Sequence, residues 1–325
     1  MKTLVSLVAL VLFLAASVVA QTEAPSLKDG EHHVVLNGIK QWYRVAGASN
    51  HTTPILILHG GPGGNSYNFE HGVGPLIERF ATIIYYDQRG SGRSDAPALD
   101  TDYTIAEILT DIEALRKQLT VEKLTLLGFS FGGQLALEYA LRYPEHVDKL
   151  IVQSATNGDL VRTVEFQTYG FLQQAEGSRR SELEHLSHVP VQDVNKRFQD
   201  IWDSADHKAV DRFLFVDSQV AALNRRLYDE SRLENTGKMA KVIFSTPFRQ
   251  PSLMDELDRI QASTLVMVGL HDRNVGVDSN REIADALPHA SLVIFSRSAH
   301  FPDMEEPGKY AASIERFLRL GQQSH

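Results

Sequence analysis

The sequence predicts an α/β fold in which a mostly parallel central sheet is flanked by helices and carries an inserted helical cap. Apolar runs, as at residues 54–58 and 82–86, are typical of parallel strands that are buried on both faces. Segments with apolar residues at helical spacing separate these runs, and strands that alternate with helices form parallel sheets. The chain has 325 residues, enough for one large domain with an insertion.

Residues 1–20 have the pattern of a signal peptide. Lys2 is followed by an apolar run from residue 4 to residue 19, and small residues end at Ala20 before the chain turns polar at Gln21. The apolar run is shorter than an ordinary membrane span, so a retained anchor is the less favoured alternative. We therefore expect an exported protein, periplasmic or secreted, without a stable membrane anchor after cleavage.

Composition limits the classes of partner and chemistry. The chain has 32 Lys and Arg against 41 Asp and Glu, so its net charge is −9, and no basic run marks a site for nucleic acid or an anionic membrane. It has no cysteine, which excludes disulfides, cysteine-ligated metals and a lipid-modified N-terminus. We expect a small-molecule or short-peptide substrate, no cofactor, no metal and no nucleic acid, and the sequence indicates no oligomeric state.

The predicted sheet begins with a hairpin, in which residues 32–36 and 41–45 meet at Asn37-Gly38, a strong turn signal. Thr104 and Glu107 form a predicted capping box at the start of an amphipathic helix. The other predicted strands are residues 54–58, 82–86, 124–127, 149–152, 264–268 and 292–295.

The pattern changes between residues 157 and 262. Charged and aromatic residues mix at helical spacing, and no buried strand is predicted there. We interpret this segment as a helical cap over the C-terminal edge of the sheet, inserted into a core made of residues 21–156 and 263–325. A run of ordinary outer helices is the alternative.

The most informative motif is Gly128-Phe129-Ser130-Phe131-Gly132. It joins the predicted strand 124–127 to a helix-favouring segment at residues 134–140, which is the context of a nucleophile elbow. Gly128 and Gly132 lack a Cβ, so the strand and the helix can approach closely around a strained serine. A glycine-rich turn would fit the spacing alone, but the flanking strand and helix favour Ser130 as a nucleophile.

A serine nucleophile needs a histidine that is oriented by a carboxylate. In this architecture the acid and then the histidine follow the nucleophile, each just past the end of a strand. Asp272 follows strand 264–268 and His300 follows strand 292–295, so both occupy the expected positions. Asp303 or Glu305 could replace Asp272 only if their loop folded back.

The tetrahedral intermediate of acyl transfer also needs N–H donors for its oxyanion. Phe131, directly after the nucleophile, supplies one. The loop after strand 54–58 supplies the other, and we expect Gly61 because a residue without a side chain lets its amide face the substrate. A plain strand-to-helix turn is the alternative for this loop. Asp87, Arg89 and Arg93 are expected to fix a neighbouring turn.

Motifs from nearly the whole predicted core also carry a family resemblance. They are His59-Gly60-Gly61-Pro62-Gly63, Asp87-Gln88-Arg89-Gly90-Ser91-Gly92-Arg93-Ser94, Gly128-Phe129-Ser130-Phe131-Gly132-Gly133, Gly269-x-x-Asp272, and Ala299-His300 with Glu305-Glu306-Pro307. With them, residues 54–156 and 263–318 resemble the α/β-hydrolase superfamily and, within it, the proline iminopeptidase family of serine peptidases. The resemblance implies a Ser130–Asp272–His300 triad, a helical cap, and release of an N-terminal residue, often proline, from short peptides or amides.

The sequence departs from that family at two places. Phe131 stands where the peptidases commonly have tryptophan, and the cap lacks the recognisable context in which family glutamates hold the substrate's free amine. Glu230, Glu234 and Glu256 are candidates for that role by charge alone. We expect an exported serine hydrolase with an aminopeptidase-like activity, and a carboxylesterase or lactonase is the alternative. A ligand-binding protein on the same fold is a third hypothesis.

Overall fold

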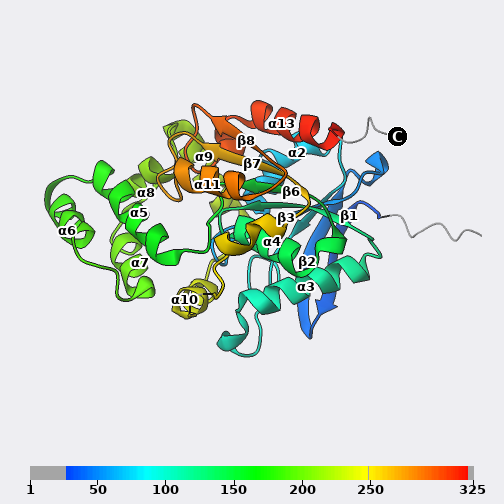
Figure 1. Ribbon diagram of the computed structural model, residues 1–325, viewed down its shortest axis with the longest axis horizontal. Coiled ribbons are helices and arrows are strands. Elements are labelled where there is room, and N and C mark those ends of the chain that lie inside the picture. Colours follow the sequence, from blue (N-terminus) through cyan, green and yellow to red (C-terminus); the bar gives the residue numbers. More distant parts are fainter. Residues whose placement is uncertain (1–26, 248, 321–325) are drawn as a thin grey trace, which may run out of the picture.

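The structure is a computed structural model that describes residues 27–247 and 249–320. The predicted signal peptide lies outside these residues. The described residues form an eight-stranded sheet with the strand order β1-β2-β4-β3-β5-β6-β7-β8 (Figure 1). The strands are β1 (Gly30–Leu36), β2 (Ile39–Ala46), β3 (Ile55–Leu58), β4 (Ile83–Tyr86), β5 (Leu124–Phe129), β6 (Val147–Gln153), β7 (Ser263–Gly269) and β8 (Ala290–Phe295).

Helices lie between the strands and after the last of them. The helices are α1 (Tyr67–His71), α2 (Gly74–Ile77), α3 (Ile105–Gln118), α4 (Phe131–Arg142), α5 (Leu160–Gln174), α6 (Gly177–Ser187), α7 (Val194–Trp202), α8 (His207–Leu214), α9 (Ser218–Ser231), α10 (Lys238–Ser245), α11 (Val277–Ala286), α12 (Pro302–Glu305) and α13 (Pro307–Arg319). Short 3-10 turns lie at Ala48–Asn50, Asp100–Asp102, Pro144–His146 and Met254–Arg259.

The predicted mostly parallel sheet is confirmed. From β4 through β3 to β8, each strand is parallel to its neighbour, whereas β1 and β2 are antiparallel at one edge. The predicted hairpin between them is also confirmed, with φ of 47° at Asn37 and 84° at Gly38. Two successive positive φ angles define the turn that matches the twist of paired strands. Thr104 caps α3 as predicted, because its side chain accepts the N–H of Glu107.

Both faces of the sheet are buried, which explains why its central strands are apolar without alternation. Leu56 and Leu58 of β3 pack in the cluster that includes α3, α4 and α11. Ile55 and Ile57 point to the opposite face and pack with α1, α2 and α13. A two-residue period therefore sends the side chains of one strand into two separate cores.

The segment between β6 and β7 contains α5–α10, which we call the inserted helices. No strand occurs among the described residues of this segment. Phe171, Leu183, Ile201 and Phe213 form a small apolar core of their own, in which the rings of Phe171 and Phe213 stack at 4.0 Å. Figure 1 shows α5–α8 projecting to the left, beyond the edge of the sheet layer.

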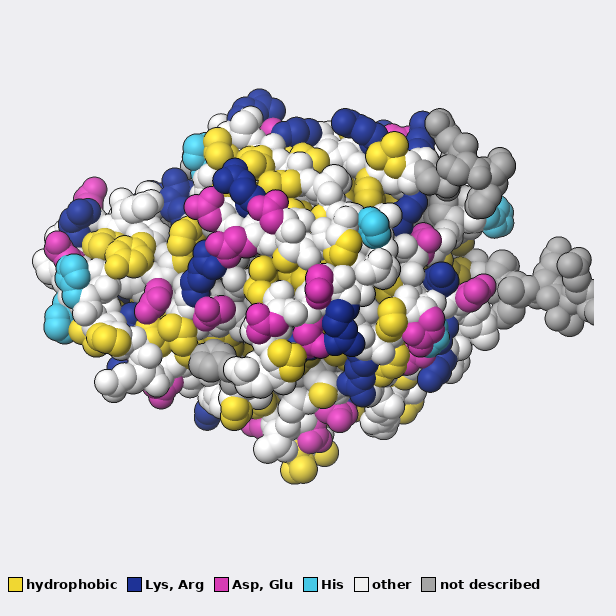
Figure 2. All heavy atoms as spheres, viewed as in Figure 1, with side chains coloured by type: hydrophobic (Ala, Val, Ile, Leu, Met, Phe, Trp, Pro, Cys, Tyr) yellow, Lys and Arg dark blue, Asp and Glu magenta, His cyan; other side chains and the backbone are white. Residues whose placement is uncertain are grey.

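The surface carries both signs of charge. On the face shown in Figure 2, Lys and Arg are interspersed with Asp and Glu, and no extended area of one sign appears there. Among the residues that the structure describes, none of the helices is long and apolar enough to cross a membrane. Within the same residues, no group of three or more His, Asp or Glu side chains is arranged to hold a metal ion.

Candidate active site

Ser130 lies in a sharp turn between a strand and a helix. β5 ends at Phe129, α4 begins at Phe131, and Ser130 between them has φ 55° and ψ −122°. Residues with a Cβ rarely adopt such angles, which cost about 1–3 kcal/mol. The Ser130 N–H donates to the carbonyl of Gln153, at the end of β6, over 2.8 Å. The neighbouring strand therefore helps to hold the strained turn.

Two glycines make this turn sterically feasible. A Cβ on Gly128 would lie 2.1 Å from the carbonyl oxygen of Gly132, and a Cβ on Gly132 would lie 2.0 Å from that of Leu58. Both distances are shorter than any real Cβ contact, so β3, β5 and α4 can meet here only without side chains. The predicted close approach of strand and helix is confirmed.

His300 and Asp272 come together from two neighbouring strand ends. Asp272 lies in the turn after β7, His300 follows β8, and Nδ1 of His300 is 3.0 Å from Oδ2 of Asp272. The other carboxylate oxygen accepts the N–H groups of Asn274 and Val275 at 2.8 and 3.1 Å. Because the contact with Asp272 occupies Nδ1, Nε2 is the nitrogen that can exchange a proton with a ligand.

The surroundings of Asp272 favour its charged form. Burial alone would raise the pKa of this carboxyl, but the attraction to His300 and the hydrogen bonds from His300, Val275 and Asn274 hold the pKa below its usual range. Asp272 therefore places a negative charge 3.0 Å from Nδ1 of His300.

The predicted oxyanion donors lie on the wall of the same cavity as Ser130 and His300. Phe131 is the first residue of α4, and the first N–H groups of a helix have no partner within the helix. Gly61 lies in the loop after β3 with φ 129°, a conformation that side chains disfavour. Phe131 and Gly61 therefore both border the cavity in front of Ser130.

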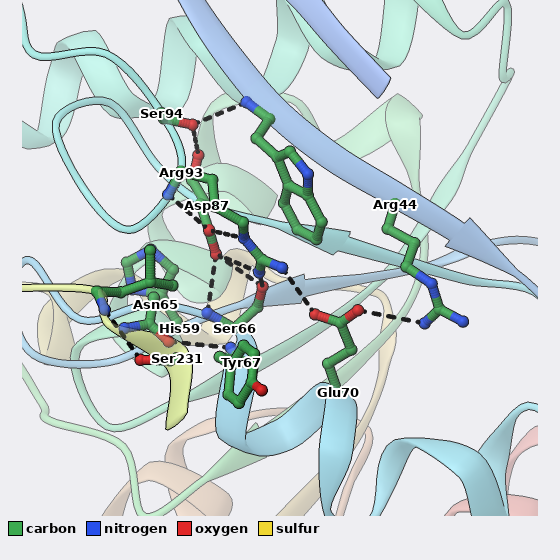
Figure 3. A network of polar contacts seen from close by, with 12 residues as sticks. Arg44, His59, Asn65, Ser66, Tyr67, Glu70, Asp87, Arg93, Ser94 and Ser231 are labelled. Carbon is green, nitrogen blue, oxygen red and sulfur yellow. Dashed lines mark hydrogen bonds and ion pairs between the residues drawn. The ribbon is translucent and has the colours of Figure 1, made fainter. Parts of the chain in front are cut away.

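A buried polar network fixes the loop that carries Gly61 (Figure 3). Oδ1 of Asp87 accepts the N–H and the hydroxyl of Ser66 at 2.9 and 2.7 Å, and Oδ2 accepts Nε of Arg93 at 2.7 Å. The guanidinium of Arg93 also reaches Glu70 at 3.0 Å and stacks on the ring of Trp42. Asp87 and Arg93 were expected to fix their own turn. They also hold Ser66, at the end of the loop that leads into α1.

His59 fixes the near end of the loop. Its Nε2 accepts the N–H of Gln88 at 3.1 Å, and its Nδ1 lies 3.0 Å from the carbonyl of Gly60. Complete burial lowers the pKa of His59, although Asp87 partly opposes this. The ring is therefore neutral, and because Nε2 is an acceptor, Nδ1 carries the proton and donates to Gly60. Arg89 acts elsewhere, binding Asp111 at 2.7 and 2.9 Å.

The cavity in front of Ser130 has a volume of about 420 Å³. Aromatic rings and side-chain amides dominate its wall. The described residues that line it include no Lys or Arg. They include one carboxylate, which belongs to Asp303. The lining amides are Asn65, Asn68, Gln167, Asn224, Asn235 and Asn274.

The inserted helices supply one side of the cavity and are bonded to the core around it. Asn68 of α1 donates to the side chain of Asn224 in α9 at 2.6 Å. The backbone N–H of His300 donates to the carbonyl of Leu214, the last residue of α8, at 3.1 Å. These bonds join both faces of the cavity, since Leu214 and Asn224 also line it.

The three glutamates proposed to bind an amine are not brought into this cavity. Glu230 and Glu234 are exposed, and neither lines it. Glu256 lies at a second cavity, where it pairs with Arg249 and Arg259.

The carboxylates considered as substitutes for Asp272 also have other partners. Glu305 accepts the backbone N–H groups of Val216 and Asp217 at 2.7 and 2.9 Å, and Asp303 accepts the amide of Gln153 at 2.6 Å. Sequence reasoning did not select Asp303 as a cavity residue. The only available signal was its position three residues after His300.

The sheet, the elbow and the two residues that follow β7 and β8 define a hydrolase architecture. Residues 53–307 match the alpha/beta hydrolase fold family, so the chain belongs to that family. The chain is 29% identical to a proline iminopeptidase of Saccharolobus solfataricus, over 86% of this chain and 89% of the relative. It is 27% identical to a 2-hydroxy-6-oxononadienedioate/2-hydroxy-6-oxononatrienedioate hydrolase of Paraburkholderia xenovorans, over 94% of this chain and 99% of the relative.

A solved structure supports the same fold. A proline iminopeptidase-related protein from Thermus thermophilus superposes with a TM-score of 0.73 at 20% identity, covering 90% of this chain and 98% of that one. The protein is therefore a hydrolase of the α/β fold that is similar to proline iminopeptidases and to meta-cleavage product hydrolases.

Proposed function

We propose that the protein is a serine hydrolase that cleaves a small acyl substrate through an acyl-enzyme. The observation that carries the proposal is that Asp272 contacts His300, which lines the same cavity as the strained Ser130. A hydroxyl becomes a useful nucleophile when a positioned base removes its proton. Strain at the serine and a carboxylate behind the histidine are both features of that chemistry.

In this mechanism Ser130 Oγ attacks the carbonyl carbon while Nε2 of His300 takes its proton. Asp272 holds the ring through Nδ1 and stabilises the imidazolium. The amides of Gly61 and Phe131 donate to the oxyanion of the tetrahedral intermediate. His300 then protonates the leaving group, and a water attacks the acyl-enzyme with His300 as its base. The hydrolysis regenerates the Ser130 hydroxyl.

For the substrate, we propose release of an N-terminal residue from short peptides or amides, as the similarity to proline iminopeptidases suggests. The lining of the cavity favours this over the dicarboxylates for which other relatives, such as the hydrolase of Paraburkholderia xenovorans, are named. Both carboxylates of such a substrate would enter a cavity whose described lining has no Lys or Arg to pair with them. Burying an unpaired charge is costly.

A carboxylesterase or lactonase is the second candidate. The amide and aromatic side chains of the lining suit a neutral ester as well as a peptide. The two candidates differ in whether the substrate carries a cation.

Two further assignments belong to this proposal. Residues 157–262 act as a cap that covers the acyl site of a core made of residues 21–156 and 263–325. The bonds from the inserted helices to Asn68 and His300 support this assignment.

The chain is exported, periplasmic or secreted, after cleavage near Gln21. The pattern of residues 1–20 supports this assignment. N-terminal sequencing of the exported protein should return Gln21, and Met1 would indicate an anchor instead.

One activity screen tests the proposed reaction. Purified protein is assayed with prolyl and other aminoacyl arylamides, with the same compounds N-acylated, and with short acyl nitrophenyl esters. Faster turnover of the free-amine arylamides supports the peptidase. Turnover confined to esters, or equal turnover of free and acylated amines, supports the carboxylesterase or lactonase. Ser130→Ala should lack activity in every arm, because members of a triad act as a unit.

A further inference from the structure

Asp303 is an unusual residue for the wall of an apolar cavity. It is only 5% exposed, yet it lines the cavity together with Ser130 and His300. The described lining provides no Lys or Arg to balance it. Carboxylates are rarely buried without a partner of opposite charge, because burial removes their hydration.

A two-step hydrogen-bond relay fixes the orientation of this carboxyl group. The hydroxyl of Tyr310 donates to Oε1 of Gln153 at 2.6 Å, which turns the side-chain amide so that Nε2 donates to Oδ1 of Asp303 at 2.6 Å. The two partners in this relay, the Tyr310 hydroxyl and the Gln153 amide, are neutral donors and carry no positive charge. The relay therefore holds the carboxyl group in place and leaves its charge unbalanced.

The same relay links Asp303 to the nucleophile. The carbonyl of Gln153 accepts the N–H of Ser130 at 2.8 Å, while its side chain binds Asp303. One residue at the end of β6 thus positions both the strained serine and the carboxyl group. Asp303 therefore lies on the wall of the cavity in which a ligand would meet Ser130.

The charged groups around Asp303 do not supply the missing cation. His300 favours its ionised form, whereas Glu305 of α12 opposes it, and burial has the largest effect. Burial raises the pKa of Asp303 to about 6, so the group is mostly ionised at neutral pH even with the cavity empty. An ammonium ion that entered the cavity would relieve this cost.

We propose that Asp303 is the residue that binds the protonated amine of the substrate. The proposal rests on the proposed function and deepens it, because it names the residue that selects an amino-terminal substrate. A primary or secondary ammonium group fits, since either donates hydrogen bonds to a carboxylate. Asp303 and Ser130 share Gln153 as a hydrogen-bond partner and line the same cavity, so an amine held at Asp303 belongs to a substrate that reacts at Ser130.

The first test compares a charged and a neutral substrate in two variants. Prolyl nitroanilide carries the amine, and nitrophenyl acetate does not. Asp303→Asn should lower the ratio of kcat/KM for prolyl nitroanilide to kcat/KM for nitrophenyl acetate by at least about 30-fold, mainly through KM. Asp285→Asn is the matched control, because Asp285 is exposed on α11 and outside the cavity. It should leave the ratio unchanged.

The second test measures amine binding without peptide cleavage. Pyrrolidine, which is protonated at neutral pH, and its neutral analogue tetrahydrofuran are compared as inhibitors of nitrophenyl acetate hydrolysis. The wild-type enzyme should bind pyrrolidine at least about tenfold more tightly, and Asp303→Asn should abolish that preference. This comparison of two ligands in the wild-type enzyme holds even if the variant does not fold.

The outcomes separate the two proposals. Inhibition by pyrrolidine that depends on Asp303, without turnover of any aminoacyl arylamide, would support amine binding and overturn the peptidase. Turnover of prolyl nitroanilide that Asp303→Asn leaves unchanged relative to the ester would overturn the role of Asp303 and keep the peptidase. Equal inhibition of the wild-type enzyme by pyrrolidine and tetrahydrofuran would also overturn amine binding at Asp303.

Discussion

Both oxygens of the Asp272 carboxylate are engaged, and one of them lies 3.0 Å from Nδ1 of His300. The second oxygen accepts two backbone N–H groups of the turn after β7. The carboxylate therefore cannot rotate without breaking bonds, and the imidazole that it holds has one fixed tautomer. This arrangement makes the carboxylate, rather than the histidine alone, the first target for mutation.

Asp272→Asn should reduce turnover by about 10⁴-fold while the protein stays folded. An amide at this position can donate to Nδ1, which stabilises the wrong tautomer and places the proton on Nε2. Turnover of nitrophenyl acetate measures the loss, and circular dichroism checks the fold. Asp285→Asn is again the control. A variant that kept more than a tenth of wild-type turnover would remove Asp272 from the mechanism.

Arg93→Lys should destabilise the protein by about 1–3 kcal/mol. Lysine keeps the charge but cannot bond Asp87 and Glu70 together or stack as a plane on Trp42. Because this network fixes the loop of Gly61, kcat should fall as well. Denaturant unfolding and ester turnover measure the two effects. The matched control is Arg226→Lys, at an exposed site on α9. Equal unfolding midpoints for the two variants would contradict the assignment.

Asp303→Asn should stabilise the protein at neutral pH, by up to about 3 kcal/mol. The folded pKa of Asp303 is about 6 and its ordinary value is 3.8, so folding favours the protonated carboxyl. Wild-type stability is therefore lost as the pH rises from about 4 to about 6, and the variant avoids that loss. His300 and Glu305 are the charged neighbours, with Gln153 and Tyr310 as polar partners.

Unfolding free energies of wild type and Asp303→Asn, measured between pH 4 and pH 8, check this prediction. The advantage of the variant should be small at pH 4 and reach its plateau above pH 6. A variant less stable than wild type at pH 7 would mean that the carboxyl group serves the fold, not a ligand.

The sequence was sufficient for the sheet and for the positions of the candidate triad. β3 is apolar on both faces because each face meets its own layer of helices, so its pattern identified it as a buried parallel strand. Asp272 and His300 could be selected because each follows such a strand. Gly128 and Gly132 could be interpreted because close packing at a turn excludes side chains whatever the rest of the fold.

The wall of the cavity could not be predicted in the same way. Asp303 is followed by Glu305 and Glu306 in one short acidic stretch, and nothing local distinguishes it from them. Its burial depends on Gln153 and Tyr310, of which Gln153 lies 150 residues away in the sequence. Glu230 and Glu234 were selected by charge alone, and tertiary packing sets which side chains of α9 and of the loop after it face the cavity.

Covalent labelling of Ser130 tests the central claim most directly. A fluorophosphonate reacts with a serine that a neighbouring base activates, and mass spectrometry of the digested protein identifies the modified residue. We expect one adduct, on the peptide that contains Ser130, with no adduct in Ser130→Ala and much slower labelling in His300→Ala. An unmodified wild-type protein, or an adduct on another residue that persists in Ser130→Ala, would contradict the account.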